Sequence, residues 1–150
     1  MKTSSKSKNV ALVLSSGGAR GLAHIGVIEE LQARGYNITS VAGSSMGALV
    51  GGLFAAGKMN EFRDWIITLS KKDVISLIDF TLTTKGFVKG EKVFERMRKL
   101  NLIPEINIED LTIPYTAVAV DILNSNEYVF RSGSLLKAIR SSISIPSVFT

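Results

Sequence analysis

Cysteine is absent from this chain of 150 residues, and histidine occurs only once, as His24. Without cysteine, the chain can form neither a disulfide nor a metal site built on thiolates, and its composition fits a reducing compartment. The single histidine restricts catalysis, because the usual Ser-His-Asp order of α/β-hydrolases needs a histidine after the nucleophilic serine. We therefore expect His24 to be a packed residue of the first helix and not a catalytic base.

Long apolar runs are also missing. The first apolar stretch, Val10–Leu14, is too short for the core of a signal peptide. The uncharged stretch Val41–Gly57 is too short and too rich in glycine for a transmembrane helix, and we interpret it as the end of a strand followed by a buried helix. We expect no signal peptide and no transmembrane segment, and a cytoplasmic protein with peripheral membrane contact.

The formal net charge of +5 does not indicate nucleic-acid binding, because three of the lysines fall within residues 1–8. A nucleic-acid surface needs a basic stripe with interleaved aromatic residues, which this sequence lacks. The densest basic stretch, residues 85–99, also contains Glu91 and Glu95. It is typical of a solvated helix face, with attraction to anionic lipid as the alternative. We predict a flexible basic tail at residues 1–8 and one domain at residues 9–150.

Hydrophobic periodicity predicts strands and helices that alternate along the first part of the chain. This order implies parallel strands joined by right-handed crossovers, and a later hairpin adds an antiparallel pair. The sequence therefore predicts an α/β fold with a mixed sheet. The predicted strands are Val10–Leu14, Ile38–Ala42, Tyr115–Ile122 and Glu127–Arg131. The predicted helices are Leu22–Arg34, Met46–Ala56, a helix capped by Asn60, Val74–Phe80, Glu91–Leu100 and Leu135–Ser142, with a loop at Thr81–Gly90.

The segment Gly43-Ser44-Ser45-Met46-Gly47 matches the pattern G-x-S-x-G at the junction of a predicted strand and a predicted helix. In a nucleophile elbow the middle serine occupies a sharp, strained turn. Only glycine leaves room two residues away on either side. The helix dipole beyond the turn favours developing negative charge. We predict Ser45 as a catalytic nucleophile and Gly43 and Gly47 as elbow glycines; the alternative is a glycine-rich turn with an inactive serine.

A second glycine-rich segment, Ser16–Gly21, follows the first predicted strand. If the first two strands are neighbours, this segment meets the elbow at the carboxyl ends of the strands, where open α/β sheets bind ligands. The amides of Gly17, Gly18 and Ala19 and the charge of Arg20 would then form an oxyanion hole. The segment is also a degenerate dinucleotide-binding pattern, but the second strand does not end in the acidic residue that would bind a ribose.

Because a serine nucleophile needs a base and no histidine follows Ser45, the residues point to a Ser-Asp dyad. Three blocks resemble the patatin-like phospholipases, most closely the bacterial branch related to the neuropathy target esterase catalytic domain. The resemblance covers nearly the whole chain from Val10. It implies a three-layer α/β/α fold with a mixed, mainly parallel central sheet. The blocks are Ser16–Gly21 with Ala23–Val27, then Gly43–Val50, and then Ala138–Pro146.

The resemblance also implies a function. Family members hydrolyse carboxylic esters of lipids or lysophospholipids with a Ser-Asp dyad, without a metal or other cofactor. Ser45 matches the family's nucleophile, and Gly17, Gly18 and Arg20 match its oxyanion motif. We therefore predict a serine acyl hydrolase with a lipid ester substrate and no nucleic-acid partner. The sequence does not specify the oligomeric state.

The family's dyad aspartate is absent from this chain. It lies in a D-G-G or D-G-A motif shortly after the Ser-Ile-Pro segment, and the chain ends at Thr150 before such a motif. We expect the fold to be incomplete at its C-terminal side. Asp121, near the end of a predicted strand, is the least implausible substitute, although a structural or surface role is the simpler interpretation. The alternative function is a catalytically incomplete module that binds lipid or protein.

Overall fold

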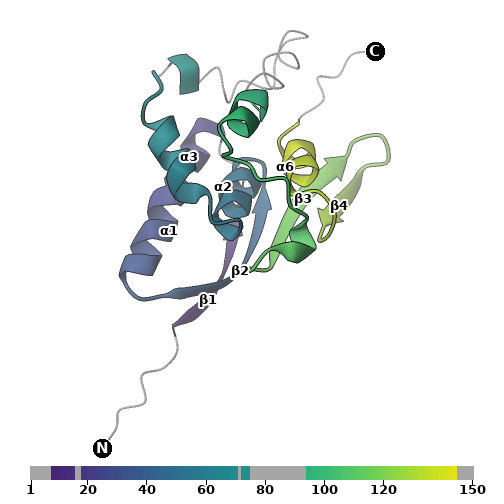
Figure 1. Ribbon diagram of the computed structural model, residues 1–150. Coiled ribbons are helices and arrows are strands. Elements are labelled where there is room, and N and C mark those ends of the chain that lie inside the picture. The colour runs from purple at the N-terminus through teal and green to yellow at the C-terminus, as the bar shows by residue number, and fades with distance from the viewer. Residues whose placement is uncertain (1–7, 16–17, 71, 75–93, 145–150) are drawn as a thin grey trace, which may run out of the picture.

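The computed structural model describes residues 8–15, 18–70, 72–74 and 94–144, which form a layer of helices packed on a sheet (Figure 1). Residues 72–74 and 94–99 are also helical. Residues 1–7 of the predicted tail, the predicted loop 81–90 and residues 75–80 of the predicted helical piece lie outside the described residues. The elements are β1 (Asn9–Leu14), η1 (Gly18–Leu22), α1 (Ala23–Ala33), β2 (Asn37–Ser44), α2 (Met46–Ala55), α3 (Met59–Ile66), η2 (Ile108–Asp110), β3 (Tyr115–Asp121), β4 (Asn126–Phe130) and α6 (Leu135–Ile143).

The sheet of the described residues has the strand order β1-β2-β3-β4. β1, β2 and β3 run parallel to one another, and β4 runs antiparallel to β3. The predicted mixed, mainly parallel sheet is therefore confirmed. Because parallel strands are joined by right-handed crossovers, a strand order that follows the sequence places the connecting helices on the same face of the sheet. Accordingly, α2 contacts both α1 and α6, and all three lie beside the sheet.

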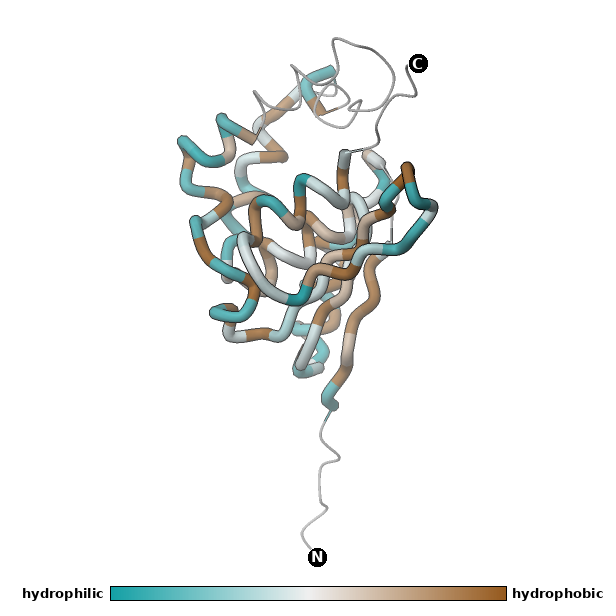
Figure 2. Tube along the Cα trace, turned by 90° about the vertical axis from the view of Figure 1, so that its right-hand side faces the viewer, coloured by the Kyte–Doolittle hydropathy of each residue, from teal (hydrophilic) through white to brown (hydrophobic). Residues whose placement is uncertain are grey.

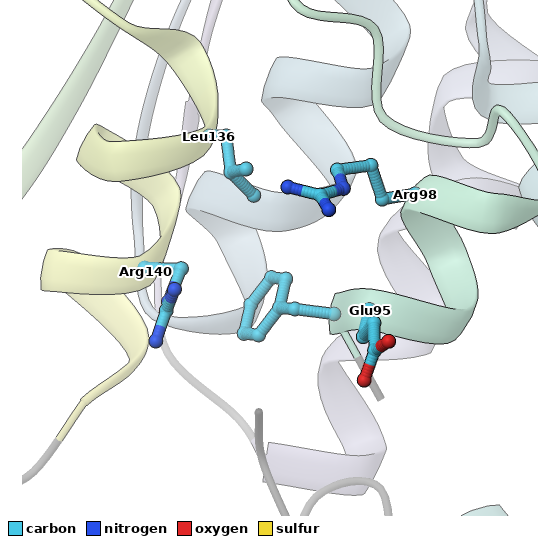
Figure 3. A pocket seen from close by; sticks show the side chains of 5 residues that line it. Glu95, Arg98, Leu136 and Arg140 are labelled. Atoms are coloured by element: carbon cyan, nitrogen blue, oxygen red, sulfur yellow. The ribbon is translucent and has the colours of Figure 1, made fainter. Parts of the chain in front are cut away.

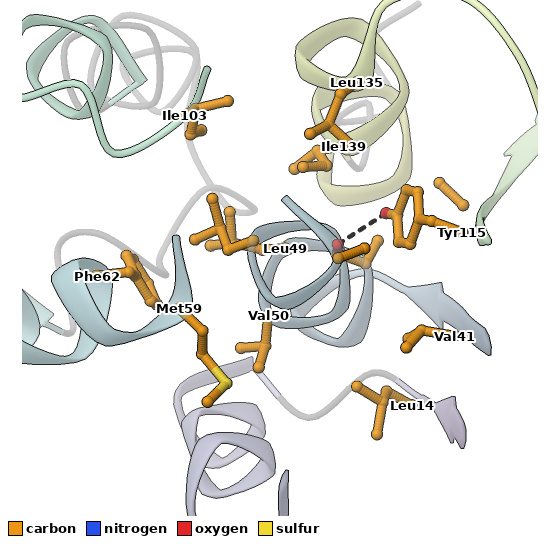
Figure 4. Packing of buried hydrophobic residues seen from close by; sticks show 14 of the residues in the cluster. Leu14, Val41, Leu49, Val50, Met59, Phe62, Ile103, Tyr115, Leu135 and Ile139 are labelled. Carbon is orange, nitrogen blue, oxygen red and sulfur yellow. Dashed lines mark hydrogen bonds between the residues drawn. The ribbon is translucent and has the colours of Figure 1, made fainter. Parts of the chain in front are cut away.

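The central helix, α2, is buried at every residue except Phe54. Figure 4 shows its side chains between the strand residues Leu14, Val41 and Tyr115 on one side and α3 on the other. The glycines of α2 permit this close packing, because a Cβ atom at Gly52 would lie 2.8 Å from Ile139 Cδ1. α2 is therefore not amphipathic: its residues are apolar on all sides and nearly all of them are buried.

A buried hydroxyl fixes α2 against β3. Tyr115 Oη donates a 2.7 Å hydrogen bond to the Ala48 carbonyl oxygen, drawn as a dashed line in Figure 4. Burial raises the pKa of the Tyr115 hydroxyl far above its usual value, so that the phenol stays a neutral donor. The bond satisfies a polar group that would otherwise be costly to bury.

The opposite face of the sheet has no helix from the described residues against it. Side chains alternate along β1, a largely apolar strand in Figure 2: Leu14 is buried, whereas Val13 is 82% exposed. Paired residues of neighbouring strands point to the same face of a sheet. The face that carries Val13 therefore continues through its partner Ala42 in β2 and, two residues further along β2, through Ser44 and its partner Val118 in β3. The helices therefore define one side of the described sheet as the core side.

Most predicted elements are present, although several of their bounds differ from the prediction. The second strand continues to Ser44, two residues further than predicted, because parallel pairing with β3 holds Gly43 and Ser44 extended. The first helix begins at Ala23, after the separate 3-10 turn η1. Asn60 is not a cap: it lies inside α3, whose N-cap position is occupied by Lys58. Gly35 ends the first helix as predicted, with φ at +75°.

Candidate active site

Ser45 occupies a strained turn between β2 and α2. Its φ of 56° and ψ of −123° lie outside the regions that L-residues normally adopt. Such a conformation costs on the order of 1–3 kcal/mol and persists only where the surrounding structure enforces it. The side chain is half-buried at the carboxyl end of the strand, and the Ser45 carbonyl accepts the first bonds of α2, from the amides of Ala48 and Leu49. The predicted strand-turn-helix arrangement is present.

The two flanking glycines make this turn sterically feasible. A Cβ atom at Gly47 would lie 2.0 Å from the Leu14 carbonyl oxygen, and one at Gly43 would lie 2.4 Å from the Gly47 carbonyl oxygen. Both contacts are with main-chain atoms, which cannot rotate away as a flexible side chain can. The close approach of Gly47 to Leu14 also shows that the end of β1 lies directly against the first turn of α2.

Ser142, near the end of α6, holds the turn from the other side. Its Oγ accepts a 2.8 Å hydrogen bond from the Ser45 amide and donates a 2.6 Å bond to the Val118 carbonyl oxygen. One hydroxyl therefore links the backbone of the strained turn, the third strand and the last described helix. Sequence reasoning did not identify this role, although Ser142 belongs to the Ala138–Pro146 block.

The predicted oxyanion segment is described only in part. Ser16 and Gly17 lie outside the described residues. Gly18 has a φ of +49° and begins η1, in which Ala19 and Arg20 are exposed. We predicted a loop here, and the structure instead has a short 3-10 helix that contacts α2. Since β1 and β2 are parallel neighbours, the segment and the Ser45 turn share one edge of the sheet, as predicted.

His24 is engaged with the backbone beside this edge. Its Nε2 lies 2.8 Å from the Ser15 carbonyl oxygen. Because a carbonyl oxygen only accepts hydrogen bonds, this contact requires the proton on Nε2. His24 therefore ties the first helix to the end of β1.

Asp121 and Asp73 accept hydrogen bonds from residues that are close to them in the sequence. Asp121, the candidate substitute for the dyad aspartate, accepts hydrogen bonds from the amides of Leu123 and Asn124 and from the Asn124 side chain. Asp73 accepts from the Ser70 hydroxyl at 2.6 Å. These contacts indicate that Asp121 shapes its own turn, which agrees with the structural interpretation.

A pocket of about 320 Å³ lies between α6 and the helical residues 94–99 (Figure 3). The Arg140 guanidinium carbon lies 5.8 Å from the centre of the Phe94 ring. The lining combines apolar side chains with charges of both signs, and it does not include Ser45. Its residues are Phe94, Glu95, Arg98, Leu136 and Arg140.

The mixed sheet and the strained Ser45 turn between two sterically required glycines define an α/β protein with a tight strand-turn-helix junction at a G-x-S-x-G segment. The family model described as "Patatin-like phospholipase" matches residues 12–150. The chain therefore belongs to the patatin-like phospholipase family, a family of lipid ester hydrolases. This match and the mixed sheet confirm the predicted fold; of its layers, the described residues show the sheet and the helices over one face.

Named relatives agree with this assignment. An uncharacterized NTE family protein of Mycobacterium tuberculosis is 48% identical over 144 residues, which cover 96% of this chain and 39% of the relative. A Mycobacterium bovis protein with the same description matches equally well. The neuropathy target esterase sws of Drosophila persimilis is 34% identical over 142 residues, which cover 91% of this chain and 10% of the relative. The chain therefore spans 39% or less of the length of these relatives.

Proposed function

We propose that this protein is a serine acyl hydrolase that cleaves carboxylic esters of phospholipids or lysophospholipids, with Ser45 as the nucleophile. The observation that carries the proposal is the Ser45 turn, with its φ of 56°. Strain of this kind is typical of functional positions, because a fold retains it only where the geometry is needed. Family membership supports the lipid ester as the class of substrate.

In the proposed reaction, Ser45 Oγ attacks the ester carbonyl carbon while its proton passes to a carboxylate. Charge develops on the carbonyl oxygen, where the amides around Gly17–Ala19 and the charge of Arg20 would stabilise it; one such donor contributes on the order of 3 kcal/mol. The alcohol leaves with a proton and an acyl-enzyme remains. Water then attacks the acyl carbon, which releases the acid and restores the hydroxyl.

The carboxylate in this mechanism is the aspartate that the family resemblance implies, in a D-G-G or D-G-A motif after Pro146. That motif is not among the 150 residues. The second candidate function is a lipid- or protein-binding module that retains the elbow. The two candidates differ in one property, which is whether the Ser45 hydroxyl is activated.

Covalent labelling by a fluorophosphonate tests this difference in the natural full-length polypeptide. The probe reacts with an activated serine hydroxyl, so the wild type should label and Ser45→Ala should not. Ser44→Ala is a matched control, because Ser44 is the adjacent serine but belongs to β2. Labelling that persists in Ser45→Ala, together with full ester hydrolysis, would contradict the assignment of the nucleophile. Absence of labelling in the folded wild type would favour the binding module.

A further inference from the structure

The end of the β3–β4 hairpin carries an unusual concentration of exposed apolar side chains. Val120 is 67% exposed, Leu123 is 95% exposed and Tyr128 is 57% exposed; Ile122, beside Leu123, is 47% exposed. Hairpin turns normally present polar residues to water. Exposed apolar side chains gathered in one place mark a contact surface more often than scattered ones do. We define Val120, Ile122, Leu123 and Tyr128 as the hairpin tip.

The hairpin tip projects from the edge of the sheet that carries Ser45. β3 runs parallel to β2, and Ser44 pairs with Val118, so the two strands are level at that point. β2 ends there, whereas β3 continues to Asp121. At about 3.3 Å per residue, three further residues carry the hairpin about 10 Å past the elbow. Figure 1 shows the hairpin extending beside α6.

The apolar side chains lie on both faces of the hairpin. Val120 pairs with Glu127, and the preceding pair is Ala119 with Tyr128. Because successive residues of a strand point to opposite faces, Val120 and Tyr128 emerge on opposite sides, and Leu123 lies in the turn between them. A rigid partner docked on one face would leave the other face in water. A fluid apolar layer entered by the turn contacts both faces at once.

The backbone of the turn is already hydrogen-bonded. The Asp121 carboxylate accepts from the amides of Leu123 at 3.1 Å and Asn124 at 3.3 Å, and from Asn124 Nδ2 at 2.7 Å. These bonds lower the cost of moving polar groups of the turn away from water. They also hold the segment in a conformation that leaves the Leu123 side chain pointing outward.

Positive charge accompanies the hairpin tip at the same edge. Arg20 is exposed in η1, directly after the carboxyl end of β1. Guanidinium groups complement phosphates. An apolar projection at an edge that also carries an exposed guanidinium group matches a phospholipid surface, whose acyl region is apolar and whose headgroup region carries phosphates.

We propose that the hairpin tip inserts into the surface of a phospholipid layer and thereby turns the Ser45 edge toward that layer. This inference rests on the proposed function, in which the layer supplies the ester substrate. The carboxylates of Glu127, opposite Val120, and Asp121, at the end of β3, limit the insertion to the interfacial depth, because a carboxylate is costly in the hydrocarbon region.

Sedimentation of the full-length protein with phosphatidylcholine vesicles tests the proposal. The double variant Ile122→Ser, Leu123→Ser should reduce partitioning by at least about tenfold, since one buried aliphatic side chain accounts for about that factor. Ile67→Ser is the matched control: Ile67 is 73% exposed at the end of α3, across the molecule from the hairpin, and its loss should leave binding unchanged. Binding through the hairpin tip should also persist in about 0.5 M salt, which screens exposed charges.

The outcomes separate this proposal from the proposed function. Fluorophosphonate labelling of Ser45 in the absence of vesicles should be the same in the double variant as in the wild type. Equal vesicle binding by the two proteins, or complete release of the wild type by salt, would overturn the role of the hairpin tip while Ser45 labelling still stood. A wild-type dimer that the double variant converts to a monomer would place a second copy on the tip and would overturn the proposal as well. Vesicle binding without labelling would support the surface and reject the hydrolase.

Discussion

Replacement of Gly47 by alanine should destabilise the protein strongly, although alanine is the better helix former. In a helix interior, glycine to alanine normally gains about 0.5–1 kcal/mol. At Gly47 the added Cβ would lie 2.0 Å from the Leu14 carbonyl oxygen and 2.5 Å from the Leu14 carbonyl carbon. The strand end and the helix must then separate, and overpacking of a core costs about 1–3 kcal/mol. We expect a net loss near the upper end of that range, because the clash is with backbone.

Gly26 provides the matched control. It lies in the interior of α1, and a Cβ atom there would meet nothing within 4 Å. Gly26→Ala should therefore show the propensity gain alone. The two variants make the same chemical change in a helix, so the difference between their unfolding free energies isolates the contact of the elbow with β1. We expect that difference to be about 3–4 kcal/mol.

Urea denaturation followed by circular dichroism measures both effects. With a slope of about 1–3 kcal/mol/M, Gly47→Ala should lower the midpoint by about 1 M or more, and Gly26→Ala should raise it slightly. Fluorophosphonate labelling should fall only in Gly47→Ala, because displacement of α2 alters the serine turn. A Gly47→Ala protein as stable as Gly26→Ala would refute the steric explanation of the elbow.

Three further predictions concern hydrogen bonds. Ser142→Ala should lower the free energy of unfolding by about 1–2 kcal/mol and slow ester hydrolysis about tenfold, because it removes both hydrogen bonds of the Ser142 hydroxyl. Ser141→Ala, at the exposed neighbouring position, should change neither, and equal effects of the two variants would contradict the role of Ser142. Tyr115→Phe should cost about 1–3 kcal/mol in thermal or urea unfolding, because it leaves a buried carbonyl of α2 without its donor. Hydrogen bonds from Asn124 lower the pKa of Asp121, so its contribution to stability should be present above the unfolded pKa and lost as pH falls through the folded pKa. A carboxyl NMR titration without a lowered pKa would contradict this.

The sequence predicted the fold well where structure depends on local pattern. The apolar run at Val10–Leu14 and the glycine that ends α1 are signals that neighbouring residues supply, and both correspond to observed elements. The predicted bounds were wrong where contacts with other parts of the structure determine where an element begins or ends. β2 extends to Ser44 because β3 pairs with it. Asn60 resembled a cap in sequence, but the preceding turn starts the helix at Met59.

The candidate site was predictable in its position but not in its supports. G-x-S-x-G implied a strand-turn-helix junction, and the Ser45 dihedral angles show one. The hydroxyl of Ser142 reaches that junction across 97 residues, and no periodicity or spacing encodes such a contact. The hydrogen bond of Tyr115 could not be predicted either, because a tyrosine at the start of a strand does not indicate which carbonyl oxygen its hydroxyl will bind. The roles of Ser45 and of the Gly17–Arg20 segment in catalysis remain predictions for the labelling experiment.

The strand order bears on how the protein folds during synthesis. Each strand of the described sheet pairs with the one made just before it, so the sheet can grow in the direction of translation. The longest step is the pairing of β2 with β3, in which Tyr115 pairs with Val41, 74 residues earlier in the sequence. The bond to the Ser45 amide forms only after Ser142 has been made, 97 residues later. A nascent chain can therefore pair these four strands before Ser142 is available to fix the strained turn at Ser45.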